Sequence, residues 1–204
     1  MHTEGLILII ASYLIGSIPT GIVIARLTGA PDPRTIGSGN IGATNVMRAA
    51  GRGAGIITLL IDILKGAVPV ILTKYIFSGS VAIISIAGIA AFLGHIFPLF
   101  LGFKGGKGVA TALGIFLVIA PLHAVAALAS FVVITIATRY VSLGSITASF
   151  LIVVLFWFFP HTKAYTPLAA AICLLIIIRH TENIKRFLNG TENKIGTLSM
   201  IGRE

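Results

Sequence analysis

The stretch VATALGIFLVIAPLHAVAALASFVVITIAT, residues 109–138, decides how many times this chain can cross a membrane. Its thirty residues are many for one transmembrane helix, which needs about 20 residues, and few for two. Ala120-Pro121 stands in the middle, and a proline inside a helix ends or bends it. The stretch is therefore either one long helix or a short helical hairpin bent at Pro121.

The composition of the whole chain indicates an integral membrane protein. Of 204 residues, 56% are hydrophobic and 10% are charged, and the mean hydropathy is +1.04. A soluble domain carries about a quarter charged residues. The start, Met1 to Glu4, lacks the basic residues that open a signal peptide, so we expect the first apolar run to be a true span. The single Cys173 lies in an apolar run and is predicted to be a small core side chain.

Apolar runs outside the central stretch predict five further helical spans. Their approximate residue ranges are 5–27, 54–77, 80–101, 143–159 and 164–178. The first contains a kink-prone patch, Gly-Ser-Ile-Pro-Thr-Gly, at residues 16–21. Asp62 and Lys65 lie three apart in the second and are predicted to pair on one helix face.

The distribution of basic residues favours the hairpin. With a bend at Pro121 the chain has seven spans, and twelve of its fifteen basic residues lie inside, against Lys74 and Lys163 outside and Lys65 within a span. One long helix would instead move Arg139 and the basic tail outside. We therefore predict an all-α integral membrane protein with seven transmembrane helices, an outside N-terminus and a cytoplasmic C-terminus. Residues 1–204 are expected to form one transmembrane domain.

This topology places three polar segments on the cytoplasmic face, at residues 34–48, 104–111 and 179–194. Three such clusters on one side favour a site over three simple connectors. The net charge of +9 then reflects the cytoplasmic side of a membrane protein, and no nucleic-acid partner is expected.

The second cluster, FKGGKGVAT at residues 103–111, combines three glycines with two lysines. Without Cβ atoms, its backbone N–H groups could surround an anion while Lys104 and Lys107 neutralise it. The alternative is a flexible basic connector between two spans. A Walker A loop is excluded, because Gly108 follows Lys107 where Ser or Thr would hold magnesium.

The other two clusters offer hydrogen-bonding groups suited to an anion. The first holds hydroxyls, amides and a guanidinium, which suit a phosphate or carboxylate; these are Ser38, Asn40, Thr44, Asn45 and Arg48. Its alternative is a capped loop that enters an amphipathic helix. In the third cluster, His180 and Asn183 would share a helix face if the last span continues into the tail.

Several chemistries lack their sequence patterns. No histidine is followed by an aspartate in the His-x4-Asp pattern of common phospholipid acyltransferases, and no Gly-x-Ser-x-Gly elbow is present. The six acidic residues are too scattered for a carboxylate metal cage. The clusters therefore predict an anionic substrate, with no metal and no cofactor.

Three long motifs give the chain a specific resemblance. They are GSGNIGATN at 37–45 with Arg48, GHIFP at 94–98 running into FKGGKGVAT, and RHTENIKR at 179–186 with Gly190 and Glu192. In this order they resemble the bacterial PlsY family, membrane glycerol-3-phosphate acyltransferases that use acyl phosphate.

The resemblance implies one reaction. The 1-hydroxyl of sn-glycerol 3-phosphate attacks a fatty acyl phosphate, which gives 1-acyl-glycerol 3-phosphate (lysophosphatidic acid) and phosphate, the first step of bacterial phospholipid synthesis. It also implies a multi-pass protein of the bacterial cytoplasmic (inner) membrane with a cytoplasmic active site. The implied partners are both substrates, the lipid bilayer, and a transient contact with the enzyme that makes acyl phosphate.

The resemblance also implies roles for the motif residues. Charge for the phosphates is expected from Arg48, Lys104 and Lys107, and orientation of the glycerol from His180 and Asn183. The implied catalytic residues are Ser38, Arg48, Lys107, His180 and Asn183. The implied substrate-binding residues are Gly37, Gly39, Asn40, Thr44, Asn45, Lys104, Gly105, Gly106 and Gly108. Either His180 or the leaving phosphate could accept the proton of the hydroxyl.

Two other function classes fit the basic face. A carrier for a phosphorylated metabolite should have ionisable residues at mid-membrane, and only Asp62 and Lys65 qualify. A non-catalytic scaffold that recruits anionic lipids would explain the charge but not the glycine pattern.

Overall fold

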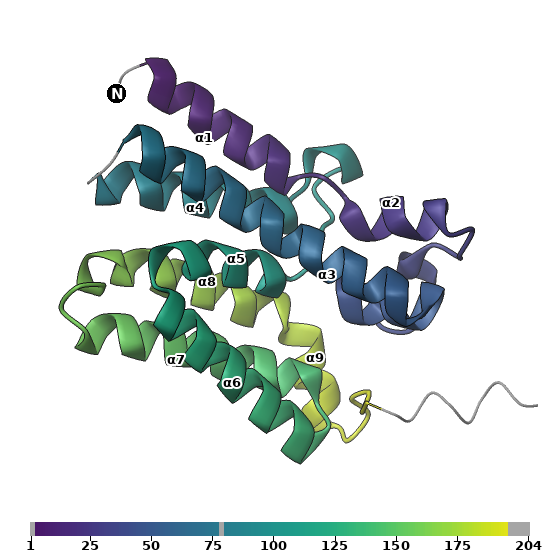
Figure 1. Ribbon diagram of the computed structural model, residues 1–204. Helices are drawn as coiled ribbons and strands as arrows, with labels where there is room; N and C mark the ends of the chain where they lie inside the picture. The colour runs from purple at the N-terminus through teal and green to yellow at the C-terminus, as the bar shows by residue number, and fades with distance from the viewer. Residues whose placement is uncertain (1–2, 78–79, 196–204) are drawn as a thin grey trace, which may run out of the picture. The chain divides into compact units, whose positions relative to one another are not determined.

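The computed structural model describes residues 3–77 and 80–195, and within these ranges it contains helices and no strand. The predicted all-α class is confirmed. By length and composition, four described helices could cross a membrane, or up to six if two bent pairs each count as one span (Figure 1). The chain divides into two compact units, residues 1–121 and 122–204, which are described in turn.

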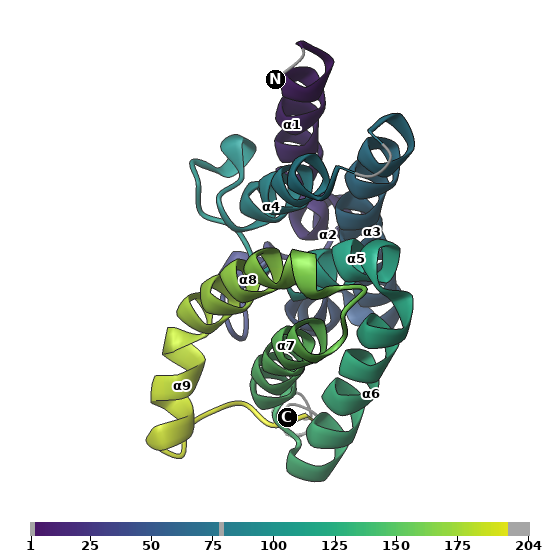
Figure 2. The same cartoon turned by 90° about the vertical axis from the view of Figure 1, so that its left-hand side faces the viewer.

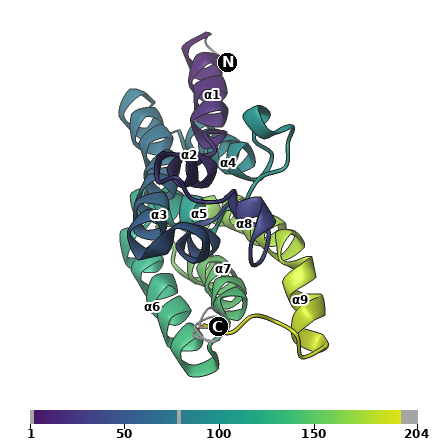
Figure 3. The same ribbon diagram turned by 90° about the vertical axis from the view of Figure 1, so that its right-hand side faces the viewer.

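The first unit begins with a broken span. Helix α1 (Thr3–Gly16) and helix α2 (Thr20–Leu27) meet at an angle of 44° (Figure 3). The break falls at Ser17 to Pro19, inside the patch that predicted a kink. A proline at this point lacks the N–H that would continue the helix.

Helix α3 (Ala43–Ile76) follows the 3-10 turn η1 (Pro33–Thr35) and is itself divided. Gly51 interrupts it with φ 86° and ψ 172°, a backbone conformation that costs glycine little and other residues much. The part after Gly51 corresponds to the predicted second span. The part before it is the helix that the alternative interpretation of the first polar cluster placed after a capped loop.

Helix α4 (Val81–Ile96) is followed by the 3-10 turn η2 (Leu99–Leu101). Residues 102–108, which contain the glycines and lysines of the second cluster and are called the Gly-Lys loop below, then lead into helix α5 (Val109–Ile119). Helices α3 and α5 run in the same direction, because Gly66 abuts the backbone of Thr111 and Lys74 Nζ donates to the carbonyl of Val118 at 3.3 Å. The loop before α5 therefore lies level with the middle of α3. Ala54 is the predicted start of the second span, and Asp62 lies eight residues further on, or about 12 Å along the helix.

The second unit, as far as residue 195, contains four α-helices and a 3-10 turn. They are α6 (Pro121–Thr138), α7 (Val141–Phe158), η3 (Lys163–Tyr165), α8 (Thr166–Arg179) and α9 (Thr181–Leu188). The break predicted in the central stretch is confirmed, since α5 ends at Ile119 and α6 begins at Pro121. Helices α7 and α8 pack together, and the buried Cys173 lies 3.6 Å from Ser149 between them, as a small core side chain.

The last span does not continue straight into the tail. Helices α8 and α9 meet at His180 with a bend of 53° (Figure 2). The count of seven spans stays a prediction, because α5 has only eleven residues and no membrane defines which helices cross. A single domain over residues 1–204 also stays a prediction.

Candidate functional site

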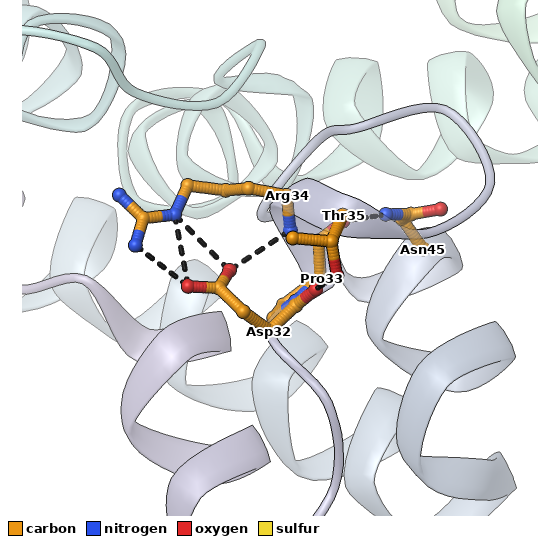
Figure 4. Close-up of polar contacts among 5 residues, drawn as sticks. All are labelled: Asp32, Pro33, Arg34, Thr35 and Asn45. Carbon is orange, nitrogen blue, oxygen red and sulfur yellow. Dashed lines mark hydrogen bonds and ion pairs between the residues drawn. The ribbon is translucent and has the colours of Figure 1, made fainter.

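The first polar loop is wrapped around one buried side chain, Asn45. Its Nδ2 lies 2.6 Å from the carbonyl oxygen of Pro33 (Figure 4). It also lies 3.0 Å from the carbonyl oxygen of Ile36 and 2.8 Å from that of Asn40, so its two hydrogens are shared among three acceptors. Its Oδ1 accepts from the N–H of Ser38 at 3.0 Å. Asn45 is only 2% exposed, so these contacts fix the loop from the inside. Its polar atoms shape the loop.

Three of the predicted residues lie close together above this amide. A Cβ atom on Gly37 would lie 2.5 Å from Asn45 Oδ1 and 3.3 Å from Arg48 Cδ, and Ser38 follows directly. The φ of Gly37 is +58°, which favours glycine. The loop thus brings the backbone of Gly37 close to the Asn45 amide and to the side-chain stem of Arg48.

The remaining residues of this loop have different surroundings. The Oδ1 of Asn40 accepts from the N–H of Gly42 at 2.8 Å, so it closes the turn before α3. Thr44 and Gly39 are exposed. The neighbouring Arg34 folds back on Asp32 at 2.6 Å, and this guanidinium lowers the pKa of the Asp32 carboxyl (Figure 4).

The Gly-Lys loop differs from the anion cradle that its glycines predicted. The N–H of Gly105 donates to the carbonyl of Ile96 at 3.2 Å, and that of Gly106 to the carbonyl of His95 at 3.1 Å. The expectation that these two amides surround an anion is therefore wrong. A Cβ on Gly105 would overlap the backbone of His95, and one on Gly106 would overlap its ring. The glycines permit a close approach, but to the end of α4.

Gly108 has a separate reason to be glycine. It precedes α5 as its N-cap with φ 81°, and it lies against the ring of Phe92. Between these glycines Lys107 is half-buried, whereas Lys104 is exposed.

The loop rests on a buried polar network. His95, which is 4% exposed, has its Nδ1 3.2 Å from Thr111 Oγ1 and 3.9 Å from Asp62 Oδ1. Lys65 Nζ lies 2.9 Å from Asp62 Oδ1 and donates to the carbonyl of Ile18 at 3.1 Å, in the break of the first span. The predicted Asp62–Lys65 pair is confirmed. It is a close ion pair without good hydrogen-bond geometry, because Asp62 Oδ1 has no directed donor among the described residues.

In the second unit, His180 is fixed at the junction of α8 and α9. It is 2% exposed, and its Nδ1 lies 2.8 Å from the carbonyl oxygen of Ile176. A carbonyl only accepts hydrogen bonds, so Nδ1 carries the hydrogen and Nε2 is the basic nitrogen of the neutral ring. The bend at this junction comes directly before the turn that contains Asn183.

The carboxylate of Glu192 accepts hydrogen bonds from Asn183 and from two other side chains. Its Oε1 accepts from Asn183 Nδ2 at 2.6 Å and from Ser142 Oγ at 2.8 Å, and its Oε2 accepts from Arg186 Nε at 2.9 Å. Burial raises the pKa of Glu192, but the hydrogen bonds from Asn183, Ser142 and Arg186 outweigh it and lower the pKa. Glu192 belongs to the third sequence motif, but the sequence alone gave it no role. The structure makes it the support of Asn183.

Comparison with known proteins identifies the family. Residues 6–190 match the profile of the family described as glycerol-3-phosphate acyltransferase. The chain belongs to the glycerol-3-phosphate acyltransferase family. Two glycerol-3-phosphate acyltransferases illustrate the likeness. The one from Syntrophotalea carbinolica is 50% identical over 94% of this chain and 98% of its own length. The one from Geobacter sulfurreducens is 48% identical over 93% and 96%.

Two crystal structures of PlsY, an integral membrane glycerol 3-phosphate acyltransferase, share this fold. The glycerol 3-phosphate form has a TM-score of 0.92 and 42% identity, over 98% of this chain and all 100% of its own. The lysophosphatidic acid form has a TM-score of 0.87 and 41% identity, over 96% and 97%.

These likenesses confirm the resemblance that the three motifs indicated. This glycerol-3-phosphate acyltransferase family member is a multi-pass membrane enzyme of phospholipid synthesis. Membership selects the acyltransferase interpretation over the carrier and the scaffold.

Proposed function

We propose that the chain transfers a fatty acyl group from acyl phosphate to the 1-hydroxyl of sn-glycerol 3-phosphate. The hydroxyl oxygen bonds to the acyl carbon, the bond from that carbon to the phosphate oxygen breaks, and phosphate leaves with the proton. The products are lysophosphatidic acid and inorganic phosphate.

The pairing of the carboxylates is the observation that supports this donor. Among the described residues, four acids each contact a cation; the pairs are Asp32–Arg34, Asp62–Lys65, Glu182–Lys185 and Glu192–Arg186. The remaining described acid, Glu4, lies in the first turn of α1. Acyl phosphate suits a site with no carboxylate base, because it is a mixed anhydride with a good leaving group and needs little activation of the nucleophile.

We assign the phosphates to the cationic and donor groups of the first two polar clusters. Arg48 and Lys107 neutralise the phosphate charges, with Lys104 as a more exposed cation and the Ser38 hydroxyl as a donor. Asn45 acts by holding the loop in shape, and Gly105 and Gly106 act by seating the second loop on α4. The other loop residues of the substrate site, assigned from their positions, are Gly37, Gly39, Asn40, Thr44 and Gly108.

We assign the glycerol to His180 and Asn183. The Nε2 of His180 accepts a hydrogen bond from a glycerol hydroxyl, and Asn183, fixed by Glu192, provides a second polar contact. The acyl phosphate itself accepts the proton, since its basic oxygens lie next to the nucleophile by the nature of the substrate. The acyl tail lies against the apolar side chains that face the bilayer.

The proposed topology has seven spans, with Met1 outside and the polar loops in the cytoplasm of a bacterial inner membrane. The contact of Lys74 with the end of α5 supports α5 as a short span, because Lys74 is one of the few basic residues assigned to the outside. Cysteine labelling from outside should reach a thiol placed at His161 and not one placed at Gly190. Labelling at Gly190 from outside would overturn the topology.

The donor is tested with purified protein in detergent. Phosphate release should require acyl phosphate and glycerol 3-phosphate together, and acyl-coenzyme A should give no lysophosphatidic acid. Turnover with the thioester at a comparable rate would overturn the proposed donor. A transient contact with the enzyme that makes acyl phosphate is part of the same proposal, because this reactive donor hydrolyses in water.

A further inference from the structure

Arg139 has a backbone conformation that arginine seldom adopts. It joins α6 to α7 with φ 65°, in the left-handed region where glycine or asparagine is usual. Its N–H donates to the carbonyl of Thr135 at 2.8 Å, which closes the end of α6. Glycine would make the same turn with less strain, so the backbone does not explain why an arginine side chain is present here.

That side chain fastens a distant segment. Nε and Nη2 of Arg139 donate to the carbonyl of Ile195 at 3.1 and 2.8 Å, and the N–H of Ile195 donates back to the carbonyl of Arg139 at 2.9 Å. We call residues 191–195 the return segment, since after α9 it runs back to the turn between α6 and α7 (Figure 2). Three hydrogen bonds thus join two residues 56 positions apart.

Tyr140, next to Arg139, also contacts α9 and the return segment. The rings of Tyr140 and of Phe187 on α9 form a T-shaped pair with centroids 5.1 Å apart, and Lys194 Nζ lies 5.3 Å from the Tyr140 centroid. Such aromatic and cation–π contacts each add modest stability. The return segment is therefore held at its far end by several contacts with the α6–α7 turn.

The middle of the return segment carries Glu192, which holds Asn183. The side chain of Glu192 is 5% exposed, and its Oε1 is shared by Asn183 Nδ2 and Ser142 Oγ. An amide that donates through Nδ2 to a carboxylate has a fixed orientation, because its Oδ1 must point the other way. The position of Glu192 therefore sets which atoms Asn183 presents.

We propose that Arg139 is a positioning residue for glycerol 3-phosphate binding. By clasping Ile195 it holds the return segment, and through Glu192 it fixes the amide of Asn183. Arg139 itself does not touch the substrate. This inference rests on the proposed role of Asn183.

Replacing Arg139 by glycine separates positioning from stability. Arg139→Gly removes the two hydrogen bonds of the guanidinium but relieves the left-handed backbone. Because these effects oppose each other, the melting temperature in detergent should change little. The KM for glycerol 3-phosphate should rise roughly tenfold, the effect of weakening a charge-assisted hydrogen bond, with the KM for acyl phosphate unchanged. Lys185→Ala is the control, since it removes one positive charge from the exposed face of α9.

Two further variants keep the test decisive. Arg139→Lys retains the charge but not the fork, so it should show a smaller rise in the same KM. In a Glu192→Gln background Arg139→Gly should add little, because both changes act through Asn183. An unchanged KM for glycerol 3-phosphate in Arg139→Gly, additive effects of the pair, or equal changes in both KM values with a fall in melting temperature would each overturn the inference.

Asn183→Ala distinguishes this failure from failure of the proposed function. If Asn183→Ala binds glycerol 3-phosphate normally, the role of Asn183 is wrong and the inference falls with it. If Asn183→Ala is impaired while Arg139→Gly is normal, the inference alone is overturned.

Discussion

Lys65 Nζ lies 2.9 Å from Asp62 Oδ1, and each of the two side chains is 4% exposed. Glu182 and Lys185 have the same three-residue spacing and the same 2.9 Å separation on α9, but there the lysine is 63% and the glutamate 70% exposed. Burial is the main difference between the pairs. Inside a protein, an ion whose partner is removed keeps its desolvation cost without compensation.

We expect Asp62→Asn to destabilise the protein by about 3–5 kcal/mol, because it leaves the Lys65 ammonium buried without its counter-ion. Asp62→Asn combined with Lys65→Met should recover most of this loss, since neither charge then remains. Thermal unfolding in detergent measures both. Glu182→Gln is the matched control and should hardly move the melting temperature. Equal effects of Asp62→Asn and Glu182→Gln would contradict the prediction.

Gly106→Ala should disturb the Gly-Lys loop through His95. The new Cβ overlaps the buried ring of His95, which contacts Thr111 Oγ1 at 3.2 Å, so the loop must move and carry Lys107 with it. Such overpacking costs about 1–3 kcal/mol, and we expect a higher KM for glycerol 3-phosphate. Gly53→Ala is the control, because no atom lies within 4 Å of a Cβ there. A normal KM in Gly106→Ala would show that the loop accommodates the methyl group.

The pH dependence of stability should report Glu192. Its pKa is lowered from 4.5 in the folded protein, so its stabilisation is fully present above that value. As the pH falls below the ordinary value, the unfolded chain binds the proton first and this stabilisation is lost. Melting curves between about pH 6 and pH 3 should show a loss of stability that is smaller in Glu192→Gln, since the other acids with a lowered pKa, such as Asp32, still contribute. The same loss in Glu192→Gln would assign it to another group.

Arg48→Ala and Lys107→Ala should each abolish most turnover while the protein stays folded. A charge-assisted hydrogen bond to phosphate contributes about 1.5–3 kcal/mol, and more if it strengthens in the transition state. Initial rates at fixed substrate concentrations test this. Arg34→Ala is the control in the same loop, since its guanidinium is paired with Asp32. Near-normal rates in either site variant would remove that residue from the phosphate site.

Local patterns in the sequence predicted the features that depend on neighbouring residues. The spacing of Asp62 and Lys65 gave their pairing, and Pro121 gave the break between α5 and α6. Each of these follows from helix geometry or from the missing N–H of proline.

Features that depend on distant parts of the chain could not be predicted. The glycines of the second loop do signal a close approach, but the sequence does not say that Gly106 meets His95 in place of an anion. No local pattern predicts that Arg139 adopts a left-handed backbone conformation, because its side chain bonds to Ile195, 56 residues away. Glu192 stood in a motif, yet only the fold shows that it holds Asn183.

The last prediction concerns the proton of the attacking hydroxyl. The Nδ1–H of His180 is directed at the carbonyl of Ile176, which leaves Nε2 as the atom that can accept from the hydroxyl. A general base of this kind is usually oriented by a carboxylate that also stabilises the imidazolium, whereas the partner of Nδ1 here is a neutral carbonyl. We therefore expect His180 to position the glycerol and the acyl phosphate to take the proton.

Turnover of His180→Gln against pH, at saturating substrates, tests this assignment. An amide can replace a hydrogen bond but cannot take a proton, so substrate-assisted transfer predicts substantial activity with the pH dependence of the unmodified enzyme. Asn183→Ala is the companion variant, since it removes a polar contact and no titratable group. If His180→Gln instead loses several orders of magnitude in kcat, together with the limb of the profile near the ordinary histidine pKa of about 6.5, then His180 is the base.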